Sequence, residues 1–200
     1  MIMKKILKFS LVLLVALIAM DVHAGNLDFT LNVKKEQGKR VAFVLNSTVK
    51  VDLSIYDAEE KLIFTEKTES PKGVYRTYDL RALPDGAYFL EAESDNKIAK
   101  YEILVLGNTA VLSANAISEV YKPSFENKKG LVWVTVLNMD KSPVNIKVYD
   151  KANNEVYDSD VMVDQNVKKV FDITKIKDEE YTFVMTYKNK SFSKTLASND

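Results

Sequence analysis

The sequence predicts an all-β protein built from two tandem antiparallel β-sandwiches, and three observations lead to this prediction. Residues 51–103 align without a gap on residues 144–196, with every position displaced by 93. Apolar and polar residues alternate with a period of two through most of both copies, which is typical of half-buried strands. Clusters of Gly, Pro, Asn and Asp divide these runs into short segments. Such a repeat indicates architecture more than ligand, because two copies share mostly what the fold requires.

Upstream of this block the copies align at a displacement of 92, which implies a one-residue insertion near 139–143. This alignment pairs Val41 with Trp133, the only tryptophan of the chain. A lone Trp at the start of a strand packs between two sheets more often than it offers a platform for sugars. The pairing therefore favours a core position for Trp133.

The first 24 residues look like a cleaved secretory signal. Basic residues precede the apolar run Phe9–Met20, and Val22-His23-Ala24 provides small residues where a signal peptidase cuts. The apolar run is shorter than the roughly 20 residues that a membrane-spanning helix needs. We expect cleavage after Ala24, export to the periplasm, the medium or the cell surface, and no membrane span in the mature chain.

Composition limits the partners of the mature chain. The chain has no Cys, so neither a disulfide nor a lipid anchor on Cys can form. Cleavage takes Lys4, Lys5, Lys8 and Asp21 from 28 basic and 28 acidic residues, which leaves 25 and 27. This balance argues against nucleic acid and anionic membranes, because both require a concentrated basic face. The remaining 176 residues suffice for two domains of about 80 residues each.

Seven strands are expected in each copy. Those of the first copy are expected at residues 27–33, 40–46, 49–56, 61–66, 73–80, 87–94 and 97–106. Those of the second are expected at residues 119–125, 131–138, 143–150, 154–160, 167–173, 180–187 and 190–197. Seven short antiparallel strands in about 80 residues are typical of an immunoglobulin-like sandwich. No helix is expected after the signal.

The predicted organisation has four parts: a signal peptide at 1–24, a first β-sandwich at 25–106, a linker at 107–118 and a second β-sandwich at 119–200. The linker contains Val111 and Leu112, apolar residues that a freely flexible tether would not favour. We expect their side chains to pack between the two sandwiches.

The densest motif runs from Asp79 to Tyr88 and has a structural interpretation. The Asp79 carboxylate can accept hydrogen bonds from backbone N–H groups two or three residues on. Gly86 can take a positive φ in the turn with Asp85, and Tyr88 can form a tyrosine corner by bonding its hydroxyl to the upstream backbone. The predicted structural turn residues of the two copies are Asp79, Asp85, Gly86, Tyr88, Asp172, Asp178 and Tyr181. The two aspartates of a copy offer too sparse an oxygen ligand set for calcium.

These residues also carry a family resemblance. Tyr56-Asp57, Tyr78-Asp79-Leu80 and Leu83-Pro84-Asp85-Gly86-Ala87-Tyr88-Phe89-Leu90 resemble the C-terminal sorting domain of type IX secretion cargo from Bacteroidetes, and related immunoglobulin-like repeats of secreted proteins in that phylum. The resemblance covers most of each copy and implies an immunoglobulin-like fold in an exported bacterial protein. The better copy is internal, and the second has Lys177-Asp178-Glu179-Glu180 where the turn glycine is expected.

The sequence argues against an enzyme. The only His, His23, leaves with the signal and Cys is absent, which excludes Ser–His, Cys–His and His-ligated metal chemistry. Two carboxylates would suffice for a glycosidase, but the candidate aspartates recur in both copies, as fold residues would. No Gly-rich phosphate loop is present. We expect no catalytic residue, no cofactor and no bound metal.

Residues that differ between the copies are freer of fold requirements. Tyr75 and Tyr101 have Lys168 and Lys194 as their counterparts in the second copy. The candidate contact surface therefore consists of Tyr75, Tyr101, Tyr121 and Trp133.

The leading hypothesis is a non-enzymatic exported module that binds a protein or another cell-surface component, in adhesion or in a structural role. Sandwich edges suit this role, because their unpaired N–H and C=O groups can accept an added strand. The alternatives are a type IX secretion cargo or component, a periplasmic assembly chaperone, which also has two sandwich domains, and a carbohydrate-binding module that uses Trp133. The sequence leaves the oligomeric state open.

Overall fold

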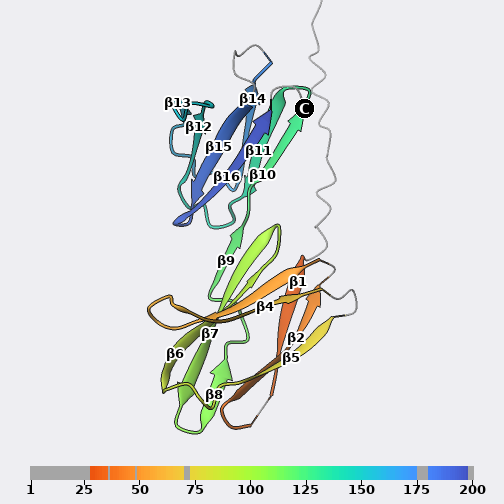
Figure 1. Ribbon diagram of the computed structural model, residues 1–200, viewed down its shortest axis with the longest axis vertical. Helices are drawn as coiled ribbons and strands as arrows, with labels where there is room; N and C mark the ends of the chain where they lie inside the picture. The colour runs from red at the N-terminus through yellow and green to blue at the C-terminus, as the bar shows by residue number, and fades with distance from the viewer. Residues whose placement is uncertain (1–27, 36, 48, 70–72, 175–179, 198–200) are drawn as a thin grey trace, which may run out of the picture.

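The structure is a computed structural model that describes residues 28–35, 37–47, 49–69, 73–174 and 180–197. Within these ranges the chain forms sixteen strands and no helix, which confirms the all-β prediction. The strands gather into two units that follow one another along the long axis, with β1 to β9 in the first and β10 to β16 in the second (Figure 1). The predicted signal peptide lies outside the described residues.

The first unit consists of two antiparallel sheets. One has the order β1-β2-β5, formed by β1 (Phe29–Lys34), β2 (Arg40–Ser47) and β5 (Val74–Asp79). The other has the order β4-β3-β6-β7-β8, formed by β4 (Leu62–Thr68), β3 (Val51–Tyr56), β6 (Gly86–Glu93), β7 (Lys97–Leu106) and β8 (Thr109–Leu112). A further strand, β9 (Ser118–Tyr121), also pairs with β7. All seven strands predicted for the first copy are therefore present.

The second unit repeats this arrangement. Its smaller sheet has the order β10-β11-β14, formed by β10 (Ser124–Lys128), β11 (Leu131–Leu137) and β14 (Asn166–Asp172). Its larger sheet has the order β13-β12-β15-β16, formed by β13 (Glu155–Asp158), β12 (Val144–Tyr149), β15 (Glu180–Tyr187) and β16 (Lys190–Ala197). A register shift follows Ile55 in β3 and Val148 in β12, 93 residues apart, so even this irregularity recurs.

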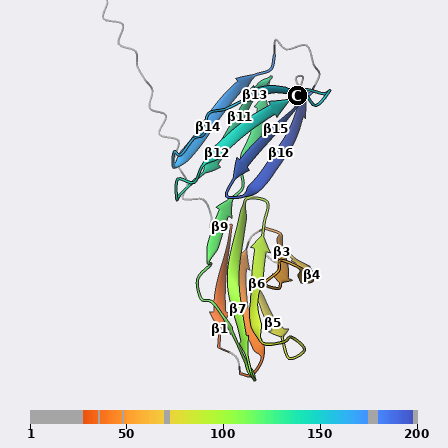
Figure 2. The ribbon, with the colours of Figure 1, turned by 90° about the vertical axis from the view of Figure 1, so that its left-hand side faces the viewer.

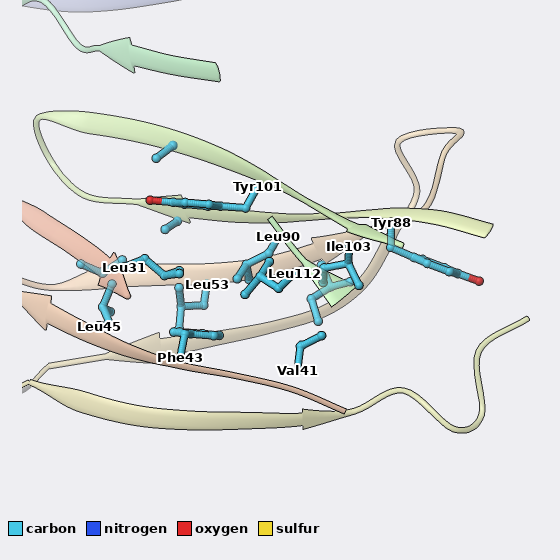
Figure 3. Close-up of a cluster of buried hydrophobic side chains, with 14 of the residues drawn as sticks. Leu31, Val41, Phe43, Leu45, Leu53, Tyr88, Leu90, Tyr101, Ile103 and Leu112 are labelled. Carbon is cyan, nitrogen blue, oxygen red and sulfur yellow. The ribbon is translucent and has the colours of Figure 1, made fainter. Parts of the chain in front are cut away.

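Each unit has its own core, filled by alternate residues of facing strands. In the first core, Phe43, Leu53 and Leu90 are completely buried, and Figure 3 shows these side chains converging from both sheets. In the second core, Phe183 is equally buried and meets the ring of Phe171 at 5.3 Å in an edge-on arrangement. Hydrophobic burial of this kind is the main favourable term in folding, so a chain without disulfides can rely on it.

The register of β11 corrects the alignment of the two copies. Val41 pairs with Tyr78, whereas Val132 pairs with Phe171, the counterpart of Tyr78. Val132 therefore takes the inward place of Val41, at a displacement of 91 rather than 92. Because successive side chains of a strand point to opposite faces, Trp133 lies on the outer face and not in the core. The connection from β11 to β12 consequently carries two extra residues instead of one.

Part of residues 107–118, predicted to be a linker, extends the sheet of the first unit as β8. Leu112 in β8 pairs with Ile103 and is buried in the first core, whereas Val111 is 63% exposed. The prediction that both pack between the sandwiches is wrong, because neighbouring strand residues face opposite ways and β8 belongs to one sheet. The strand predicted at 119–125 is two strands, β9 and β10, separated at Pro123, which has no backbone N–H to donate.

The apolar contact between the units is made by β9 and by the start of β7 beside it. Ile98 of β7 pairs with Val120 of β9, and both side chains are buried in the hydrophobic cluster of the second unit. Lys188 Nζ, from the turn between β15 and β16, donates to the Glu119 carbonyl at 2.7 Å. β9 lies between the two units in both views (Figures 1 and 2).

Candidate interaction surfaces

The four aromatic residues predicted to form a contact surface do not lie together. Tyr75 is 55% exposed in β5 of the first unit, and Tyr121 is half-buried in β9. Trp133 lies half-buried in β11 of the second unit. Tyr101 is only 5% exposed and belongs to the first core, so its assignment to a contact surface is wrong (Figure 3). Burial raises the pKa of Tyr101 to about 12, and the nearby Glu119 carboxylate adds to this effect.

Trp133 is the centre of an apolar patch on the outer face of the smaller sheet. Leu131 and Leu137 lie on the same face of β11 and are 37% and 38% exposed, and Val170, paired with Trp133, is 50% exposed. The Lys128 ammonium lies 5.7 Å from the centroid of the Trp133 ring, within range of a cation–π interaction. We call Leu131, Trp133, Leu137 and Val170 the Trp133 face.

The Trp133 face was not predicted, although the sequence contains its signal. Residues Leu131 to Leu137 read Leu-Val-Trp-Val-Thr-Val-Leu, so apolar residues occupy both phases of the strand. A strand with only one buried face needs apolar residues in only one phase. The second apolar phase of β11 therefore marks an outer face that is unusually apolar.

The turn motif of the first copy is held by its own side chains. The Asp79 carboxylate accepts from the Arg81 side chain at 2.6 Å and from the Arg81 backbone N–H at 3.1 Å. These two bonds, in that order, lower the pKa of Asp79. The Asp85 carboxylate accepts from the Gly107 backbone N–H at 2.8 Å and from Lys39 Nζ at 3.2 Å, which likewise lowers its pKa. Both carboxylates are occupied in bonds that hold loops together, which is the structural role.

The other residues of the motif that lie in the described ranges also have structural roles. Gly86 has a φ of +157°, and the Tyr88 hydroxyl donates to the Pro84 carbonyl at 2.9 Å, the hydrogen bond of a tyrosine corner. In the second copy, Asp172 accepts from the Thr174 backbone N–H at 3.0 Å, again two residues on. Tyr181 is 1% exposed in the second core. Asp178 lies outside the described residues.

Loss of the tyrosine corner should destabilise the first unit. Tyr88→Phe removes the donor to the Pro84 carbonyl, and a hydrogen bond of this kind contributes about 0.5–1.5 kcal/mol to stability. Equilibrium denaturation should show a loss of this size. Tyr56→Phe is the control, because the described residues give the half-buried Tyr56 hydroxyl no hydrogen bond, and it should change stability by less than about 0.5 kcal/mol. Equal losses in the two variants would contradict the assignment.

The buried Tyr101 should make the protein sensitive to alkali. Its pKa of about 12 in the folded state lies above the 10.0 of an unperturbed tyrosine, so the folded state holds this proton more tightly than the unfolded state. The resulting stability is present below pH 10 and is lost as the pH rises from about 10 towards about 12. Denaturation at pH 8 and pH 11 should show a smaller alkaline loss in Tyr101→Phe than in the wild type. The same loss in both would assign the effect to other groups.

The part of the chain that the structure describes contains neither a cluster of metal ligands nor a membrane-spanning helix. No three Asp, Glu or His side chains of these residues lie close enough together to form a metal site. No helix there has the length and apolar character to cross a bilayer.

Comparison with known families agrees with the resemblance noted in the sequence. Residues 29–106 match the family described as the secretion system C-terminal sorting domain. The match runs from β1 to the end of β7, so it covers the first unit up to the point where β8 begins. The suspected resemblance is thus confirmed for the first copy. No curated protein matches the chain.

Three of the solved structures that match the chain do so at low identity. The BSP domain of a biofilm associated protein is 14% identical with a TM-score of 0.28, over 84% of this chain and 30% of that one. The chicken CNTN1 FN1–FN3 domains are 8% identical with a TM-score of 0.29, over 86% and 64%. The Group B Streptococcus pullulanase SAP is 11% identical with a TM-score of 0.23, over 82% and 23%. The chain therefore spans less than two thirds of each of these chains.

Proposed function

We propose that this protein is an exported, non-enzymatic binding module that contacts a protein partner in the periplasm or at the cell surface. The observation that carries the proposal is the match of residues 29–106 to the secretion sorting domain family, whose description refers to secretion. The carboxylates of the repeated motif support a role without catalysis, because Asp79 and Asp85 are engaged in turn and loop hydrogen bonds. The family match supports export, and the binding role is our inference.

The Trp133 face is the contact surface that we propose for the partner. Interface centres are enriched in aromatic residues and poor in charge, and Trp contributes strongly to binding when it becomes buried. Such a centre is provided by Trp133, Leu131 and Val170. Charged residues border it, because Glu126 is the strand partner of Trp133, and Lys128 and Asp172 are the strand partners of Leu131. A carbohydrate partner is a less suitable occupant, since the face offers one aromatic ring.

Site-specific crosslinking in living cells tests this proposal. A photo-crosslinking amino acid in place of Val170 should yield a discrete adduct on illumination of cells that express the full chain. The matched control is Val156 in β13, which is 54% exposed against 50% for Val170 but lies on the other sheet. Adducts from both positions, or from neither, would refute a partner at the Trp133 face.

The family match also favours a second function, that of type IX secretion cargo. Under this hypothesis the protein reaches the cell surface or the medium through that secretion system. Fractionation of cells in which the system has been inactivated should then find the full chain retained in the periplasm. An unchanged distribution would exclude the cargo function and leave the binding function intact.

A further inference from the structure

The two units differ at one edge of their larger sheets. In the first unit, the outer edge of β7 is covered by β8 along residues 103–106 and by β9 along residues 97–100. Its counterpart in the second unit is β16, displaced by 93 residues. Within the described ranges, β16 pairs only with β15, so its other edge offers backbone groups for an additional strand.

The covered edge shows how an added strand would bond. On β7, the carbonyls of Lys100 and Glu102 accept from the backbone N–H groups of Ile117 and Ser113, each at 2.8 Å. The corresponding residues of β16 are Ser193 and Thr195. At the far end of β16, the Ala197 carbonyl accepts from the Asn127 side chain at 2.7 Å, so β10 already closes that end. The stretch that remains for a strand is 191–195.

The charges along β16 define what such a strand must carry. Glu119 of β9 has its carboxylate 3.4 Å from Lys97 Nζ, and its charge also raises the pKa of Tyr101. The residues of β16 at these two positions are Lys190 and Lys194, both cationic. Lys194 is exposed, and Lys190 Nζ lies 3.8 Å from the carboxylate of Glu91 in the first unit, the acid that pairs with it among the described residues. A carboxylate in the place of Glu119 would therefore approach two ammonium groups.

Lysine on an edge strand discourages pairing with a plain apolar strand. It also discourages pairing of β16 with β16 of a second copy, because antiparallel pairing of the two strands would bring like charges together, and like charges across a strand pair are destabilising. The lysines thus select against both of these occupants and in favour of an acidic one.

We propose that β16 accepts an extended acidic segment of a protein partner, which adds as an antiparallel strand and places a carboxylate between Lys190 and Lys194. This inference rests on the proposed binding function and specifies the chemistry of the partner. The template is β9 itself, whose sequence Ser118-Glu119-Val120-Tyr121 combines a carboxylate with apolar residues in an extended strand. Main-chain hydrogen bonds would supply affinity, and the lysine pair would supply specificity.

A peptide titration tests the proposal on the mature chain, residues 25–200. The probe is a capped peptide with the sequence of residues 113–122, which includes the template strand. In amide-resolved NMR spectra of the labelled protein, the peptide should shift the resonances of residues 191–195 and their β15 partners. The edges formed by β4 and β13 serve as internal controls and should not respond.

A charge exchange makes the test specific. Lys194→Glu in the protein should weaken binding of the native peptide at least fivefold, and the Glu119→Lys peptide should bind the wild-type protein more weakly by a similar factor. Combining the two changes should restore affinity. Lys168→Glu, on β14 of the other sheet, is the matched control and should leave binding unchanged.

Several results would overturn the proposal. The first is that millimolar peptide causes no shift. The second is that the shifts are confined to residues 97–100, because the peptide would then be replacing β9. The third is that the charge exchange lowers affinity and the combined changes do not restore it. Sedimentation that shows a dimer formed through β16 would identify a second copy as the occupant instead. Failure here leaves crosslinking at Val170 unaffected, because the two experiments use different sheets.

Discussion

Phe183→Ala should unfold the second unit at a denaturant concentration at which the first unit remains folded. Phe183 is completely buried and its ring packs against Phe171. Replacing a buried Phe by Ala costs about 3–5 kcal/mol, a large part of the roughly 5–15 kcal/mol that stabilises a domain. Trp133 is the only tryptophan and lies in β11, so its fluorescence reports the second unit alone. Far-UV circular dichroism should show a second, later transition from the first unit.

Leu90→Ala is the matched control for this prediction. Leu90 stands 93 residues before Phe183 and is also completely buried, but in the first core. Its substitution should leave the Trp133 fluorescence transition close to that of the wild type and move the other transition. A single transition shared by both signals in both variants would show that the two units unfold as one cooperative block.

The seven strands of the first copy could be predicted, and so could all but the first strand of the second copy, because turn chemistry and period-2 alternation recur in both copies. The position of Trp133 could not, because Leu131 to Leu137 is apolar in both phases and offers two registers. The register was decided by cross-strand pairing, in which Val132 meets Phe171. Alternation alone therefore locates a strand without fixing which face is buried when both faces are apolar.

The assignment of Tyr101 shows why differences between repeats are ambiguous. Tyr101 and Lys194 occupy equivalent positions, and in the sequence their difference indicates freedom from fold requirements. In the structure, β8 and β9 cover the edge of β7, and Tyr101 is buried in the first core, whereas the edge of β16 carries the exposed Lys194. The difference therefore reflects unequal cover of two equivalent strands. A four-residue strand such as β8 gives too short a pattern to be found in the sequence.

The core of the second unit also contains side chains from strands of the first unit, and Ile98→Ala should demonstrate this. Ile98 belongs to β7 of the first unit but is buried, at 5% exposure, in the cluster of the second unit together with Val120. Truncation of a buried Ile to Ala costs about 2–5 kcal/mol. We expect the Trp133 fluorescence transition to move to lower denaturant, with a loss in the free energy of unfolding of the second unit in this range. The transition of the first unit should change less.

Ile103→Ala, five residues further along the same strand, should behave in the opposite way. Ile103 is completely buried in the first core, so its loss should destabilise the first unit and spare the Trp133 signal. If Ile98→Ala instead moved only the transition of the first unit, the packing of Ile98 and Val120 against the second core would be wrong. If it moves the Trp133 transition, residues 124–200 alone should be less stable than the same residues within the chain, because that fragment lacks both apolar side chains that complete its core.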